Sequence, residues 1–123
     1  MMGERTMSDS VSWVSVAAAD ALPPGSILSV RVLGRNLAIY RLVNGELRAS
    51  DNCCTHEEAS LADGWLDGHV IECPLHGGRF DLDTGRGLCS PIERALDVFA
   101  VKVLDGRIVV AMPCPDGGLS TVA

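Results

Sequence analysis

Two Cys/His pairs lie close together in this sequence. They are Cys54-Thr55-His56 and, sixteen residues later, Cys73-Pro74-Leu75-His76-Gly77-Gly78-Arg79-Phe80. Each pair is compact enough to lie in one loop, and two thiolates with two imidazoles can complete a four-ligand metal site. We therefore take Cys54, His56, Cys73 and His76 as candidate ligands. The rest of the chain is expected to be a scaffold that brings these two loops together.

Three interpretations of these residues compete. They could be ordinary core or turn residues, although two such pairs rarely coincide by chance. They could hold a structural zinc ion, but zinc fingers usually separate the cysteine pair from a histidine pair on a helix. Here each pair is mixed and no helix is evident. The third interpretation is a 2Fe–2S cluster in which two histidines replace two cysteines on one iron.

Short alternating apolar segments between turn residues predict the scaffold. Together they indicate an all-β domain, an antiparallel sandwich or barrel. The ligand segment, about residues 51–86, is an insertion between its strands. Residues 1–10 are expected to form a tail, 11–112 the domain and 113–123 a second tail. The strands are expected at 11–16, 26–32, 37–43, 46–50, 65–66, 69–72, 79–82, 96–103 and 107–111.

Three turn dipeptides connect neighbouring strands. Asn44-Gly45 predicts a type I′ hairpin turn, in which both residues have a positive φ. Asp67-Gly68 and Asp105-Gly106 predict two further hairpins. His69 is expected on the surface of a strand, outside the ligand set. Leu61 lies in a segment, 59–64, that is expected to be a small bend.

Composition narrows the class of protein. The chain has 123 residues, 47% of them hydrophobic, which is enough for one domain with its own core. Its formal net charge of −6 argues against nucleic acid and anionic membranes as partners. Five cysteines, an odd number, do not indicate a secreted disulfide framework. No apolar run is long enough to span a membrane, and residues 1–10 do not resemble a signal peptide, so a cytoplasmic location is expected.

The ligand pattern resembles that of the Rieske iron–sulfur domain. Cys-x-His, Cys-Pro-x-His-Gly-Gly-x-Phe and a following Asp-x-x-Thr-Gly carry the resemblance, which extends from about Trp13 to Ala111. It implies a Rieske-like fold and one 2Fe–2S cluster, with the two cysteines on one iron and the two histidines on the other. Gly77 and Gly78 would let backbone N–H groups approach the cluster. Pro91 resembles the proline loop that covers the cluster, and Cys53 offers a weaker alternative to Cys54.

The chain departs from the high-potential branch of that family. Those proteins join the two ligand loops by a disulfide, whereas Ala59 and Leu75 occupy the matching positions here. They also donate hydroxyl hydrogen bonds to the cluster region from a Ser and a Tyr, where this chain has Gly78 and Phe80. Fewer donors stabilise the reduced cluster less. We therefore expect a midpoint potential near the low end of the Rieske range, which runs from about −150 to +300 mV.

The resemblance is strongest to the ferredoxin components of bacterial aromatic-ring-hydroxylating dioxygenase systems. Such a protein is not an enzyme. It passes single electrons from an NADH-dependent flavin reductase to a terminal oxygenase. With His69 as the single unassigned histidine, the chain lacks the residues for the mononuclear iron site of an oxygenase. Two alternatives are the small subunit of an assimilatory nitrite reductase and a zinc-binding interaction module.

Overall fold

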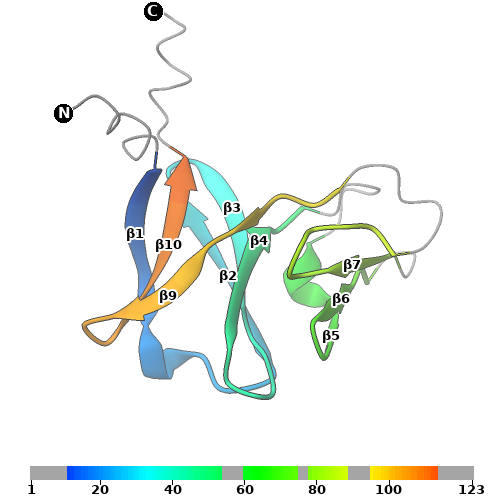
Figure 1. The fold of residues 1–123 in the computed structure, drawn as a ribbon, viewed down its shortest axis with the longest axis horizontal. Coiled ribbons are helices and arrows are strands. Elements are labelled where there is room, and N and C mark those ends of the chain that lie inside the picture. Colours follow the sequence, from blue (N-terminus) through cyan, green and yellow to red (C-terminus); the bar gives the residue numbers. More distant parts are fainter. Residues whose placement is uncertain (1–10, 54–59, 75–77, 89–94, 114–123) are drawn as a thin grey trace, which may run out of the picture.

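The computed structural model describes residues 11–53, 60–74, 78–88 and 95–113. In this part of the chain the strands form three antiparallel sheets, which confirms the predicted fold class (Figure 1). The strands are β1 (Val11–Ala18), β2 (Ser26–Val32), β3 (Arg35–Arg41), β4 (Leu47–Asp51), β5 (Trp65–Asp67), β6 (Val70–Glu72), β7 (Arg79–Asp81), β8 (Val98–Phe99), β9 (Val101–Leu104) and β10 (Arg107–Pro113). Two 3-10 turns, η1 (Ala19–Ala21) and η2 (Leu61–Asp63), interrupt them.

The sheets divide the domain into a scaffold and a smaller lobe. One scaffold sheet has the order β1-β10-β9 and the other the order β2-β3-β4-β8. The third sheet, β5-β6-β7, lies between β4 and β8 in chain order and projects to one side of the scaffold (Figure 1). We call this projecting part the ligand lobe, because the candidate ligand Cys73 directly follows its strand β6.

Strand β3 explains how the scaffold and the ligand lobe pack together. Successive side chains of a strand point to opposite faces of its sheet. Ala38 and Tyr40 face the core shared with the ligand lobe, whereas Leu37 and Ile39 face the core between the two scaffold sheets. All four residues are fully buried, so the apolar run of β3 does not alternate with polar residues.

The turn at Asn44-Gly45 differs from the prediction. Gly45 has a φ of +94°, but Asn44 does not have a positive φ, so the type I′ assignment is wrong. The N–H of Gly45 donates to the carbonyl of Leu42, and the N–H of Leu42 donates to the carbonyl of Glu46. These bonds enclose a three-residue loop with glycine in the left-handed position, the next most common hairpin connection.

Two other connections also differ. The N-terminal hairpin turns at Leu33-Gly34, with φ values of +50° and +82°, so β3 starts at Arg35 rather than at Leu37. In the ligand lobe Asp67 pairs with Val70, which places His69 in the two-residue turn and not on a strand as predicted. By contrast, the Asp105-Gly106 hairpin is confirmed, and both residues have a positive φ.

The strand predicted at 96–103 is divided at Ala100. The part before it, β8, pairs with β4, and the part after it, β9, pairs with β10. One extended segment therefore joins both scaffold sheets. The predicted tails 1–10 and 114–123 lie outside the described residues. No helix in the described part of the chain is long and apolar enough to cross a membrane.

Candidate metal centre

The four candidate ligands are divided between described and undescribed parts of the chain. Cys73 follows β6 and is 1% exposed. Cys54, His56 and His76 lie outside the described residues. The same is true of Pro91, in the predicted proline loop, and of Ala59 and Leu75, the positions that match the missing disulfide. The structure does describe the residues at which both ligand loops begin and end. The geometry of the site is therefore built from these loop bases.

Asn52 closes the base of the first ligand loop, 54–59. Its side-chain amide donates to the hydroxyl of Ser60 at 2.8 Å, and its side-chain carbonyl accepts from the N–H of Ala62 at 2.8 Å. The main-chain carbonyl of Asn52 accepts from the N–H of Leu61 at 2.7 Å, and Cys53 forms an antiparallel bridge with Ser60. The two ends of the loop are thus held side by side, with Cys54 and His56 between them in sequence.

The second ligand loop, 75–77, is closed by its own backbone. The N–H of Cys73 donates to the carbonyl of Gly78 at 2.7 Å, and the next pair outward, Glu72 and Arg79, belongs to the β6–β7 ladder. The loop is therefore the tip of a hairpin, and His76 lies within that tip in sequence.

Gly64 brings the two loop bases together. A Cβ atom built on Gly64 would lie 2.0 Å from the main-chain oxygen of Glu72, the residue before Cys73. The φ of Gly64 is −89°, a value that other residues adopt, so glycine is required here by the close approach and not by conformation. Leu61, three residues earlier, and Cys73 lie in the same buried cluster. The return of the first loop therefore packs directly against the start of the second.

The Asp-x-x-Thr-Gly motif forms the turn that follows β7. Asp81 accepts the N–H of Asp83 through its carboxylate at 2.8 Å, and its main-chain carbonyl accepts the N–H of Gly85. Gly85 has a φ of +84°, and a Cβ there would lie 2.0 Å from the main-chain oxygen of Leu96. The N–H of Leu96 in turn donates to the carbonyl of Gly85. This contact closes the segment that contains the predicted proline loop.

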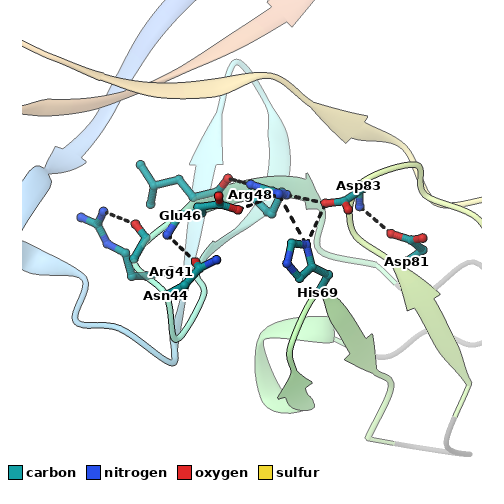
Figure 2. Close-up of polar contacts among 9 residues, drawn as sticks. Arg41, Asn44, Glu46, Arg48, His69, Asp81 and Asp83 are labelled. Carbon is teal, nitrogen blue, oxygen red and sulfur yellow. Dashed lines mark hydrogen bonds and ion pairs between the residues drawn. The ribbon is translucent and has the colours of Figure 1, made fainter.

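An ion cluster joins the ligand lobe to the scaffold. Arg48 of β4 donates through Nε to the carboxylate of Asp83 at 2.7 Å and through its terminal nitrogen to Glu46 at 3.0 Å (Figure 2). The ring of His69 lies 3.1 Å from the same oxygen of Asp83. The hydrogen bonds from Arg48 and then from His69 lower the pKa of Asp83 below its ordinary value of 3.8. The sequence pattern gave no sign of this contact between His69 and Asp83. The contact helps to hold the ligand lobe in its orientation against the scaffold.

A second polar contact lies inside the shared core. The hydroxyl of Tyr40 and the hydroxyl of Ser50 are 2.8 Å apart, and the Ser50 hydroxyl donates to the carbonyl of Asp51. Burial raises the pKa of Tyr40 well above its ordinary value of 10.0, and the hydrogen bond with Ser50 opposes this only partly. The phenol is therefore neutral, and it fixes the end of β4 from which the first ligand loop departs.

The described part of the site fits an iron–sulfur ligand set. Cys73 offers a thiolate, the ligand type that Fe–S clusters select, from a position shielded from water among apolar side chains. The two loop bases converge on that position. The structure thus agrees with a cluster held between two loops, although it describes one of the four ligands directly.

Comparison with known proteins gives the family. The profile of the Rieske [2Fe-2S] domain matches residues 12–111. The chain belongs to the Rieske [2Fe-2S] domain family. It is 45% identical over 98 residues to the ferredoxin component of a naphthalene 1,2-dioxygenase system from Pseudomonas aeruginosa, covering 80% of this chain and 93% of that protein. This relative confirms the predicted class, an electron-transfer ferredoxin rather than an enzyme.

Solved structures confirm the Rieske fold. A complex of reduced oxygenase and oxidised ferredoxin in carbazole 1,9a-dioxygenase contains a chain that is 45% identical, with a TM-score of 0.74 over 80% of this chain and 92% of that chain. A structure described as an NADH-dependent nitrite reductase small subunit from Mycobacterium tuberculosis is 28% identical, with a TM-score of 0.76 over 83% of this chain and 96% of that chain. The fold is shared with both classes, but the identity is higher to the ferredoxin.

The residues that hold the Rieske loop bases were not identifiable from the motif alone. Asn52 directly precedes the two cysteines at the start of the first ligand loop, and Gly64 lies in the segment predicted as a bend. An asparagine before a cysteine pair and a glycine after a short turn are common features of loops. Their roles depend on contacts with Ser60 and Glu72, which the sequence pattern does not show.

Proposed function

We propose that Cys54, His56, Cys73 and His76 hold one 2Fe–2S cluster of the Rieske type. The chain then carries one electron at a time from an NADH-dependent flavin reductase to the terminal oxygenase of an aromatic-ring-hydroxylating system. A cytoplasmic location accords with this role and with the odd number of cysteines. The relatives' role as dioxygenase ferredoxins supports the choice of partners.

The convergence of the two loop bases is the observation that carries this proposal. A mixed cluster needs ligands from both loops at once, because each loop supplies one cysteine and one histidine. The contact of Gly64 with the main chain of Glu72 holds the return of the first loop against the start of the second. Independent loops or a single-knuckle metal site would not require such an approach.

The chain's own residues bind and shield the cofactor. The cluster, when bound, supplies a reversible one-electron couple. The Asn52 side chain and the Cys73–Gly78 hydrogen bond hold together the two ends of each ligand loop. Phe80 is fully buried in the same cluster as Cys73 and has no hydroxyl to donate. We therefore keep the expectation of a midpoint potential near the low end of the Rieske range, and a value above about +100 mV would contradict it.

Low-temperature EPR of the dithionite-reduced protein tests the ligand set. We expect a rhombic signal with a lower average g value than clusters held by four cysteines give, and we expect His76→Cys to abolish or alter it. His69→Cys is the matched control, because His69 is a histidine of the ligand lobe that contacts Asp83 and Arg48 instead. An unchanged spectrum in His76→Cys would exclude that histidine as a ligand. Zinc without iron and sulfide in the wild-type protein would indicate the interaction-module alternative.

Electron transfer is tested with the purified components. The reduced protein should support product formation by a terminal oxygenase such as that of carbazole 1,9a-dioxygenase when its reductase and NADH are present. With a net charge of −6, docking on a basic partner surface should weaken as salt is added. Support of nitrite reduction in place of aromatic hydroxylation would favour the small-subunit alternative.

A further inference from the structure

Four side chains form one row across the outer face of the ligand lobe. Trp65 pairs with Glu72, and Glu72 pairs with Arg79, in the β5-β6-β7 register. Leu88 continues the row, because its N–H donates to the carbonyl of Arg79 and the neighbouring residues, Phe80 and Gly87, form a bridge. With neighbouring strands about 4.8 Å apart, the row extends about 14 Å from Trp65 to Leu88. We call these four residues the lobe row.

The alternation of the strands places the lobe row on the surface. On each of the three strands, the residue next to the row residue faces the buried core. These neighbours are Leu66, Ile71 and Phe80. The row residues therefore point outward. Trp65 is 58% exposed and Leu88 47% exposed, so a large aromatic and a large aliphatic side chain flank the Glu–Arg centre of the row. Exposed side chains of these types, grouped together, are typical of interaction surfaces.

The second tryptophan of the chain has a different environment. Trp13 lies on β1 of the scaffold, and the ammonium of Lys102 is 4.2 Å from its ring centre. Its ring is thus contacted by a cation within the protein itself. Trp13 is 44% exposed, a value comparable to that of Trp65. It is therefore a matched control for an exposed tryptophan away from the ligand loops.

The lobe row borders the second ligand loop. Glu72 directly precedes Cys73, and Arg79 directly follows Gly78, the hydrogen-bond partner of Cys73. Electron tunnelling weakens steeply with distance, so a redox partner has to bind beside the ligand loops. A protein that covers the lobe row satisfies this requirement. An interaction surface on the β1 sheet would not.

We propose that the lobe row is a docking surface for the terminal oxygenase, with Trp65 as its main anchor. This inference rests on the proposed function and adds the surface that recognises the electron acceptor. The partner should offer an apolar pocket for the indole ring, bordered by basic side chains. The basic border follows from charge, because the outer face of the ligand lobe has three carboxylates, Asp67, Glu72 and Asp81, against two guanidinium groups, Arg79 and Arg86.

The oxygenase is chosen over the reductase for a specific reason. A ferredoxin 45% identical to this chain has been solved in a complex with its oxygenase, so a protein of this class binds that class of partner directly. Arg79 also forms an ion pair with Asp67 at 3.1 Å, which keeps the centre of the row in place beside the indole. A partner surface then meets a largely preformed site, which lowers the entropic cost of docking.

The test uses the cluster-loaded protein with the terminal oxygenase and reductase of carbazole 1,9a-dioxygenase. Truncation of a tryptophan anchor commonly weakens an interface at least about tenfold. We expect Trp65→Ser to raise the KM of the oxygenase for the ferredoxin by at least about that factor and to leave the KM of the reductase within about twofold. Trp65→Tyr should recover most of the loss, and Trp13→Ser should change neither KM. The EPR spectrum should be unchanged in all three variants, and each should still unfold cooperatively on heating.

A second measurement does not depend on turnover. Protein labelled with 5-fluorotryptophan should give two ¹⁹F resonances, which Trp13→Phe and Trp65→Phe assign. Adding unlabelled oxygenase should shift or broaden the Trp65 resonance and leave that of Trp13 unchanged. If wild-type protein supports no oxygenase turnover, the proposed function itself fails. If wild type is active and Trp65→Ser is equally active, or affects the reductase as much as the oxygenase, the docking proposal is overturned.

Discussion

Replacement of Gly64 by alanine tests the reasoning about the loop bases most directly. A Cβ at this position would lie 2.0 Å from the oxygen of Glu72 and 3.1 Å from its carbon, and real Cβ atoms essentially never come within 3.0 Å of another heavy atom. The obstacle is backbone rather than a flexible side chain. Segment 61–64 and strand β6 would therefore have to separate by at least about 1 Å, the minimum that restores an allowed contact.

This displacement has two measurable results. Forcing extra volume into a packed site costs about 1–3 kcal/mol, which corresponds to a decrease of about 4–12 °C in melting temperature for a domain of this size. The moved segment also lies next to Cys73. We therefore expect Gly64→Ala to lower the iron content per chain or to alter the EPR line shape, in addition to lowering the melting temperature.

The control is Gly68→Ala, in the turn between β5 and β6. Gly68 has a φ of +62°, and a Cβ there would meet nothing within 4 Å. Its replacement introduces backbone strain of about 1–2 kcal/mol without any clash. The control should lower the melting temperature but leave iron content and EPR spectrum unchanged. A Gly64→Ala protein with wild-type stability and an unaltered spectrum would refute the account of the joined loop bases.

Three further predictions concern other contacts of the site. Gly85→Ala combines a strained φ of +84° with a clash against the oxygen of Leu96, so calorimetry should show a larger loss of stability than for Gly68→Ala. Asn52→Ala removes the partner of the part-buried N–H of Ala62, at a cost of about 0.5–1.5 kcal/mol, and urea unfolding together with the rate of iron release to a chelator should both reveal it. Tyr40 is the single tyrosine of the chain and its pKa is raised in the folded state. Its contribution to the free energy of unfolding should therefore be constant below about pH 10 and should decrease above it, because the tyrosine of the unfolded chain ionises first. Urea titrations at pH 8 and above should show this decrease in wild type, and Tyr40→Phe should reduce it.

Much of the fold could be predicted from the sequence, because strand alternation and turn residues are local patterns. Strand β2 has the predicted bounds, and the Asp105-Gly106 hairpin follows from two residues that tolerate positive φ. The turn at Leu33-Gly34 was missed because leucine is rarely found at a φ of +50°. Residues 96–103 form one largely apolar run. Nothing in this run indicates that the chain leaves one sheet and joins the other at Ala100.

The candidate site was predictable to the level of its ligand types and their spacing. The motif names four ligands, and three of them lie outside the described residues, so the ligand set stays a prediction. The contacts that support the ligand loops could not be predicted in this way, because they join residues that are not neighbours in the sequence. The amide of Asn52 meets Ser60 across the loop, and Arg48 meets Asp83 across 35 residues. Such pairs depend on how the chain folds back on itself, which spacing along the sequence does not encode.

The pairing of β1 with β10 determines when the first scaffold sheet can form during synthesis of the chain. Val11 pairs with Pro113, so during synthesis β1 leaves the ribosome about 100 residues before the strand that it pairs with, and its sheet cannot form until β10 follows. The bases of the ligand loops are local by comparison, since Asn52 and Ser60 are eight residues apart. The bases of the ligand loops are therefore expected to form early during synthesis, while β1, an edge strand among the described residues, is a segment that needs protection from aggregation until β10 is available.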